Sequence, residues 1–299
     1  MSTDPINTID EGSSGGRSLW SDAWQVLRRN RAAMVALIIL TSMTAMVVIA
    51  PLLSPYSFDY TDWDRISVAP SIAEGHPFGT DALGRDLFVR TLYGGRISLM
   101  VGLVATLVSL IIGISYGAIA GYLGGRVDQI MMRIVDILYA LPFMFLVILL
   151  MVFFGRNILL IFVAIGAINW LDMARIVRGQ TLSLKTREFI EAARAGGVST
   201  PRIIRRHIVP NLLGVVAIYV TLTIPQVILV ESFLSFLGLG VQEPMTSWGA
   251  LVNEGAREME SSPWTLIFPS LFLAVTLFCF NFIGDGMRDA LDPRDRSGQ

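Results

Sequence analysis

The sequence predicts an all-α integral membrane protein with six transmembrane helices. Hydrophobic residues make up 53% of its 299 residues and charged residues only 16%, whereas a soluble globular chain carries about 25% charged residues. Long charge-free runs alternate with polar segments, and most of these runs reach the about 20 apolar residues that a helix needs to cross a bilayer. This composition excludes soluble-enzyme, disordered and disulfide-rich classes.

The runs without Asp, Glu, Lys, Arg or His define the expected spans. They cover residues 32–58, 97–125, 137–155, 157–171, 208–230 and 261–284. The fourth run is short, so its helix must continue through Asp172 to Arg175, two residues that lie one turn apart and can pair. The resulting divisions are an N-terminal tail (1–31), a first transmembrane helix (32–53), an outer loop (54–97), a five-helix core (98–284) that contains an inner segment (186–210) and an outer loop (237–264), and a C-terminal tail (285–299).

The distribution of positive charge predicts that both termini lie in the cytoplasm. Arg28, Arg29 and Arg31 directly precede the first run and favour a cytoplasmic N-terminus. When the six spans are threaded from there, most of the 23 Lys and Arg residues fall on the inner face. The outer segments hold only Arg65, Arg85, Arg90, Arg96, Arg156 and Arg257.

The sequence lacks the features needed for nucleic-acid binding, metal binding and ATP binding. The net charge of −1 provides no basic field for nucleic acid, so we expect no nucleic-acid partner. The single cysteine, Cys279, lies in an apolar run and offers no metal-ligand cluster. The only lysine, Lys185, follows Leu184, whereas a phosphate-binding loop requires Gly-Lys followed by Ser or Thr. We therefore expect no catalytic site, no metal and no cofactor bound by this chain.

The second run contains a regular glycine pattern. Gly113, Gly117, Gly121 and Gly125 are spaced every four residues, which places them on one face of a helix. Such a groove lets a neighbouring helix approach closely. Tight packing and a sliding surface in a moving transporter are both compatible with this pattern.

The inner segment 186–210 is predicted to form two short helices. The first ends at Gly196 and Gly197, since glycine commonly terminates helices. Thr200 supplies the N-cap of the second helix, and Pro210 ends or kinks that helix before the fifth span.

A motif in this segment resembles the EAA motif of ABC importer permeases. The residues that carry the resemblance are Glu191, Ala192, Ala193, Gly197, Ile208 and Pro210. Ile208 is one residue closer to Pro210 than in the commonest form of the motif. The resemblance implies a type I ABC importer permease fold, in which 186–210 is a cytoplasmic coupling-helix loop that docks on separate ATP-binding subunits.

Other segments extend the resemblance over most of the chain. Residues 76–86 and 284–293 are similar to signatures of the dipeptide/oligopeptide/nickel permease branch, and residues 171–180 and 232–240 are similar to its oligopeptide C-type subunits. The resemblance implies a bacterial cytoplasmic (inner) membrane protein, surrounded by membrane lipid, that imports oligopeptides. Its implied partners are a homologous B-type permease subunit, two ATP-binding subunits that use ATP and Mg, and an extracytoplasmic peptide-binding protein.

Glu231 is a candidate for the translocation path, because carboxylates in spanning segments often line such paths.

Dipeptides, nickel or another small cargo remain alternatives within the same branch. An ion-coupled secondary transporter would require a carboxylate near the midplane and an inverted repeat, and a scaffold or receptor would not need an inner segment that binds an ATPase.

Overall fold

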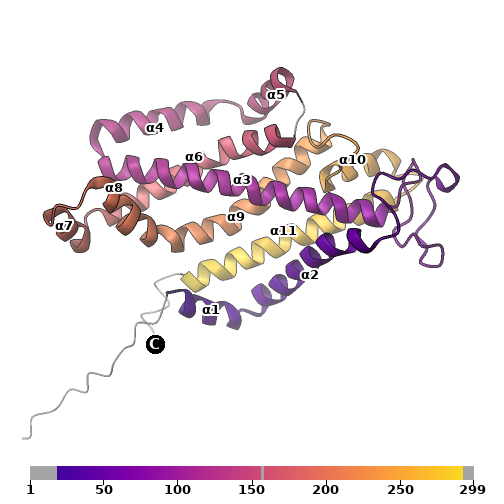
Figure 1. Ribbon diagram of the computed structural model, residues 1–299, viewed down its shortest axis with the longest axis horizontal. Coiled ribbons are helices and arrows are strands. Elements are labelled where there is room, and N and C mark those ends of the chain that lie inside the picture. The colour runs from indigo at the N-terminus through magenta and orange to yellow at the C-terminus, as the bar shows by residue number, and fades with distance from the viewer. Residues whose placement is uncertain (1–18, 156–157, 292–299) are drawn as a thin grey trace, which may run out of the picture.

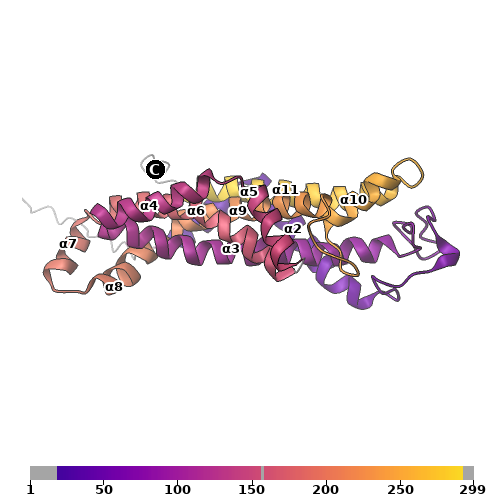
Figure 2. The same cartoon turned by 90° about the horizontal axis from the view of Figure 1, so that it is seen from above.

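The computed structural model describes residues 19–155 and 158–291, and in these ranges the regular structure is helical. The parts of the two expected tails before residue 19 and after residue 291 lie outside the described residues. Figures 1 and 2 show a flat, elongated bundle whose long helices run lengthwise.

Five long helices form the body of the bundle. They are α2 (Arg31–Leu53), α3 (Leu87–Leu123), α6 (Ile158–Leu184), α9 (Val209–Phe236) and α11 (Trp264–Leu291). The shorter elements are α1 (Leu19–Arg29), η1 (Trp63–Arg65), α4 (Gly125–Ala140), α5 (Phe143–Phe154), α7 (Glu188–Ala195), α8 (Thr200–Ile203), η2 (Ile204–Ile208) and α10 (Trp248–Glu258). The helices α7 and α8 lie at one end of the bundle, and α10 lies at the other end with the segment that joins α2 to α3 (Figure 1).

Four helices within the described residues are long and apolar enough to cross a membrane: α2, α3, the helix 200–236 and α11. The third expected span, 137–155, is not one helix, because α4 ends at Ala140 and α5 begins at Phe143. Pro142 explains the break: proline lacks an amide N–H and favours an extended conformation in the preceding residue, and Leu141 has a ψ of 134°. The fourth expected span continues through Asp172 and Arg175 within α6, as predicted.

Both expected outer loops contain helical residues. The helix α3 begins at Leu87, inside the segment 54–97, because the Asp86 side chain accepts a hydrogen bond from the Val89 amide at 2.8 Å. In the segment 237–264, Ser247 caps α10 by accepting from the Ala250 amide at 3.2 Å.

The expected N-terminal tail also contains structure. Ala23 and Leu27 of α1 are buried against Ala33 and Ala290, so α1 packs on the C-terminal part of α11. Asn30 then caps α2 by accepting from the Ala33 amide at 3.1 Å. The start of α2 and the end of α11 therefore lie together at the same end of the bundle.

The predicted glycine groove on α3 receives α6. A Cβ atom at Gly113 would lie 2.5 Å from the Met173 side chain, and one at Gly117 would lie 2.4 Å from the Ala174 carbonyl oxygen. Gly121 faces α6 in the same way, whereas Gly125 starts α4 with a φ of +56°. The glycines therefore provide close helix packing in this conformation.

This contact gives a prediction for stability. Gly117→Ala places a methyl group against the backbone of α6 and is expected to lower the free energy of unfolding by about 1–3 kcal/mol, the usual cost of overpacking. Unfolding of the purified chain in mild detergent measures the change. Gly179→Ala is the matched control, because no atom lies within 4 Å of a Cβ at that position. Equal stability of the two variants would contradict the packing argument.

Candidate functional site

The inner segment is anchored to the bundle by a buried isoleucine. Ile190 of α7 has an exposed fraction of 0% and belongs to an apolar cluster with Ile203 and Ile208. The same cluster includes Tyr122 of α3 and Val177 of α6. The segment that carries the motif residues is therefore packed on the inner ends of two long helices.

Gly197 closes α7 with a left-handed turn. Its φ is +76°, and the Val198 amide donates to the Ala193 carbonyl at 3.1 Å while the Gly197 amide donates to the Arg194 carbonyl at 3.0 Å. This pattern ends many helices and requires a residue that tolerates positive φ. No atom lies within 4 Å of a Cβ at this position, so backbone conformation, not space, demands glycine.

The opposite side of α7 faces away from the bundle. Glu188, Glu191 and Ala192 are exposed, and Phe189 is 44% exposed despite its aromatic ring. Neither glutamate side chain forms a hydrogen bond or ion pair with another described residue. α7 therefore presents an acidic and partly apolar surface at the end of the bundle.

The second short helix is not separate from the fifth span, which corrects the prediction. Its cap position is Ser199, whose side chain forms no capping hydrogen bond, so Thr200 is the first residue of the helix and not its N-cap. The helix continues through the π-helical turn η2 into α9 without ending at Pro210. In η2 the Val209 amide donates to the Ile204 carbonyl five residues earlier, and this widened turn directly precedes the proline. The last two motif residues thereby differ in exposure: Ile208 is buried in the core and Pro210 is exposed.

Charged residues connect the helices beneath this segment. Arg178 of α6 donates to both carboxylate oxygens of Asp128 on α4, at 2.5 and 2.7 Å. The Lys185 ammonium donates to the Gly121 carbonyl at 3.0 Å, so it ties the end of α6 to α3. These bonds join the inner ends of three helices.

Glu231 lies far from this segment, near the end of α9 closest to α10. Its side chain is fully buried, and it accepts hydrogen bonds from Ser98 at 3.2 Å and from Ser235 at 2.7 Å. Ser98 also accepts from the Trp248 amide at 3.1 Å. Glu231 therefore connects α9 to α3 and α10 and reaches no solvent in this conformation, and its place on a translocation path stays a prediction.

A buried charge cluster at the same end was missed by the sequence analysis. Arg90 is only 1% exposed; it donates to Asp81 and holds both carboxylate oxygens of Glu254 on α10, at 2.8 and 3.2 Å. Arg85 adds a bond to Asp81 at 2.7 Å. Burial raises the pKa of Asp81, but the charges of Arg90 and Arg85 outweigh it and leave the pKa below its ordinary value.

The residues 76–86, which are similar to a signature of the permease branch, contribute to this cluster. His76 and Asp86 are both buried, with 2.7 Å between Nδ1 and a carboxylate oxygen. Asp81 and Arg85 come from the same stretch. The many charged residues within 76–86 could have indicated a charge cluster. The sequence could not show that Glu254 of α10 joins it, because this residue is distant in the sequence. In the part of the chain that the structure describes, no group of His, Cys, Asp or Glu side chains could hold a metal ion.

Comparison with known proteins gives two family matches. Residues 113–297 match the family described as "Binding-protein-dependent transport system inner membrane component", and residues 18–70 match the "N-terminal TM domain of oligopeptide transport permease C". Among solved structures, the inward-facing methionine ABC transporter MetNI superimposes with a TM-score of 0.55 at 20% identity and covers 67% of this chain and 96% of that one. At this identity the likeness supports the fold alone.

Curated relatives are similar over nearly the whole length. The oligopeptide transport system permease protein OppC of Escherichia coli K12 is 64% identical over 94% of this chain and 93% of its own length. OppC of Haemophilus influenzae is 59% identical over 96% and 93%, and the dipeptide permease protein DppC of Bacillus subtilis is 48% identical over 93% and 87%. With the first family match covering residues 113–297, the chain belongs to the inner membrane components of binding-protein-dependent transport systems.

Proposed function

We propose that this chain is the transmembrane permease subunit of an ATP-driven ABC importer that takes up oligopeptides. The observation that carries the proposal is the exposed face of α7, which holds Glu191 outward while Ile190 fixes the helix to the bundle. The names of the relatives in Escherichia coli and Haemophilus influenzae support oligopeptides as cargo. Dipeptides are the alternative cargo, because the dipeptide permease of Bacillus subtilis is also similar to this chain.

In this proposal the chain crosses the membrane six times. The spans are α2, α3, the broken pair α4–α5, α6, α9 and α11, and both termini are cytoplasmic. The positive charges of residues 185–207, which follow α6, favour a cytoplasmic position for α7 and α8. The segment 54–86 and α10 then lie on the extracytoplasmic side, where a peptide-binding protein delivers the cargo.

The energy comes from partner subunits. The chain lacks the Gly-Lys-Ser/Thr sequence of a phosphate-binding loop, so two separate ATP-binding subunits bind ATP and Mg. A homologous B-type permease supplies the other half of the pore. Movement of an ATP-binding subunit against α7 is transmitted through Ile190 to α3, α6 and the start of α9, since these elements share one apolar cluster.

A co-purification experiment tests this assembly. A tag on this chain should recover a second permease and two ATP-binding polypeptides from solubilised membranes, and the complex should show ATPase activity that peptide and binding protein stimulate. A chain that purifies alone and transports peptide in vesicles under a proton gradient would instead be a secondary transporter.

Glu191→Gln is predicted to impair coupling without affecting folding. Its side chain makes no bond within the described chain, so the free energy of unfolding should stay within about 0.5 kcal/mol of the parent. Peptide uptake by the complete transporter should fall about tenfold, as expected for a lost charge-assisted contact with the ATP-binding subunit. Arg126→Gln, an exposed change on α4 outside the segment 186–210, is the control and should retain uptake. Full uptake by Glu191→Gln would remove this residue from the docking surface.

The backbone of Gly197 provides a second test of coupling. Gly197→Val forces a β-branched residue to a φ of +76° and should distort the turn after α7, so that ATP hydrolysis continues while peptide uptake is lost. Gly197→Asn is the matched control, because asparagine tolerates this region. Uptake and ATPase rates measured on the same vesicles distinguish the two variants, and equal behaviour of both would show that conformation at this position is irrelevant.

A further inference from the structure

Charged side chains occur at the middle of α6. Asp172 lies about 20 Å from either end of this helix, given a rise of about 1.5 Å per residue. The adjacent Met173 packs on Gly113, which lies near the centre of the charge-free run 97–125 of α3. Asp172 is therefore at the depth of the hydrocarbon core in the proposed topology.

These charges are on the side of α6 that faces away from α3. Met173, Ala174 and Val177 are buried, whereas Asp172 is half-buried and the Arg175 side chain is 42% exposed. Arg175 pairs with Asp136 of α4 at 2.8 Å. Ionised residues at this depth face the protein interior or a water-filled cavity and commonly mark substrate pathways.

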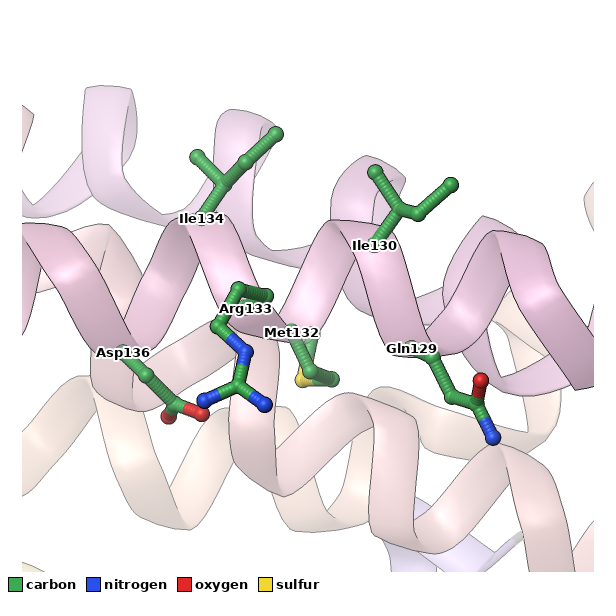
Figure 3. Close-up of a pocket in the computed structure, with 6 residues that line it drawn as sticks. All are labelled: Gln129, Ile130, Met132, Arg133, Ile134 and Asp136. Carbon is green, nitrogen blue, oxygen red and sulfur yellow. The ribbon is translucent and has the colours of Figure 1, made fainter.

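The helix α4 carries a polar stripe toward the same region. Figure 3 shows Gln129, Arg133 and Asp136 on one side of α4, while Ile130 and Ile134 point to the other. These residues, Ile130 and Ile134 included, line an open hollow of about 630 Å³ along α4. Asp136 belongs both to this hollow and to the ion pair with α6, so the polar faces of the two helices meet.

A second cavity contains Asp172 itself. It has a volume of about 350 Å³ and lies between α4, α5, α6 and α9. Its polar lining residues are Tyr139, Asn169 and Asp172, and Leu146 and Val230 contribute apolar wall. This combination of a few polar groups in an apolar cavity is typical of small-molecule sites.

The polar groups of this cavity are suited to a cation. The Asp172 carboxylate forms no hydrogen bond or ion pair with another described residue, since the nearby Arg175 is paired with Asp136 and stacked 4.4 Å from the Tyr139 ring. The Asn169 amide nitrogen donates to the Ile165 carbonyl at 2.9 Å, which leaves its Oδ1 as an acceptor. A carboxylate and an amide oxygen can together accept hydrogen bonds from an ammonium group.

We propose that the cavity between α4, α6 and α9 binds the positively charged amino terminus of the transported peptide, with Asp172 as the residue that receives it. The proposal rests on the proposed import of peptides. Asp172 would then contact the amino terminus, a group that all unmodified peptides share. The apolar wall of the cavity would accept peptide side chains of different shapes. Glu231, which accepts hydrogen bonds from Ser98 and Ser235, is not part of this site.

Thiol labelling tests the accessibility of this cavity. Cys279 is the only cysteine, so Cys279→Ala provides a cysteine-free chain into which Asp172→Cys is introduced. The complete transporter in vesicles is treated with a charged, water-soluble thiol reagent, which reacts with a hydrated thiolate. Asp172→Cys should react, and saturating transported peptide with its binding protein should slow the reaction at least about fivefold. Ile111→Cys, at an exposed apolar position in the charge-free run of α3, is the control and should stay unlabelled.

Two results would overturn the proposal. Absence of labelling at Asp172→Cys in every nucleotide state would mean that the partner permease or lipid covers the cavity. Labelling without protection by peptide would mean that water enters but peptide does not bind there. The Cys279→Ala parent must first show ATP-dependent uptake, so failure of the importer assignment is detected separately from failure of the site.

Uptake by charge variants tests the role of the carboxylate. Asp172→Asn should raise the KM for peptide about tenfold or more, since a hydrogen bond to a charged group is replaced by a neutral one. Asp172→Glu should restore most of the affinity, and a merely structural role would instead change assembly of the complex. An unchanged KM in Asp172→Asn would refute the assignment.

Discussion

The close contact between α3 and α6 is the constraint on which the inner half of the structure depends. Because Gly113 and Gly117 have no side chains, the backbone of α6 lies against α3 and buries Met173 and Ala174. That packing fixes the rotation of α6, so its charged residues must lie on the other side. It also brings together the two helix ends on which Ile190 rests, and the position of the segment 186–210 follows from the same contact.

The half of the bundle that contains α10 is held together by buried hydrogen bonds and ion pairs. Arg90 and Glu231 are buried ionisable residues: Arg90 connects α3 to α10 through Glu254, and Glu231 of α9 accepts from Ser98 of α3, which also accepts from the Trp248 amide of α10. Burying such groups is costly unless every partner is present, so these contacts tolerate few alternative arrangements. The inner segment, in contrast, rests on apolar contacts and presents an exposed surface.

Sequence patterns predicted features that depend on local geometry. The glycine spacing gave the groove because residues four apart share a helix face, and the turn at Gly197 followed from common helix termination. Hydropathy could not predict the break at Pro142, since it counts apolar atoms and ignores a missing N–H. Pro210 failed to end its helix because a π-helical turn and the burial of Ile208 accommodate it. The sequence could not predict the hydrogen bonds of Glu231, because the serines that donate them come from separate helices.

The unbroken helix from Thr200 to Phe236 has a mechanical consequence. Its 37 residues form a rod about 55 Å long, and the turn η2 lies close to its inner end. A rod of this kind acts as a lever arm: a small displacement at Thr200 becomes a tilt of the whole helix. The apolar contact around Leu212 and Val216 supports the rod near its first third, and the bond from Ser98 to Glu231 holds its far end against α3. A displacement at Thr200 is therefore carried along the helix to a contact that resists it.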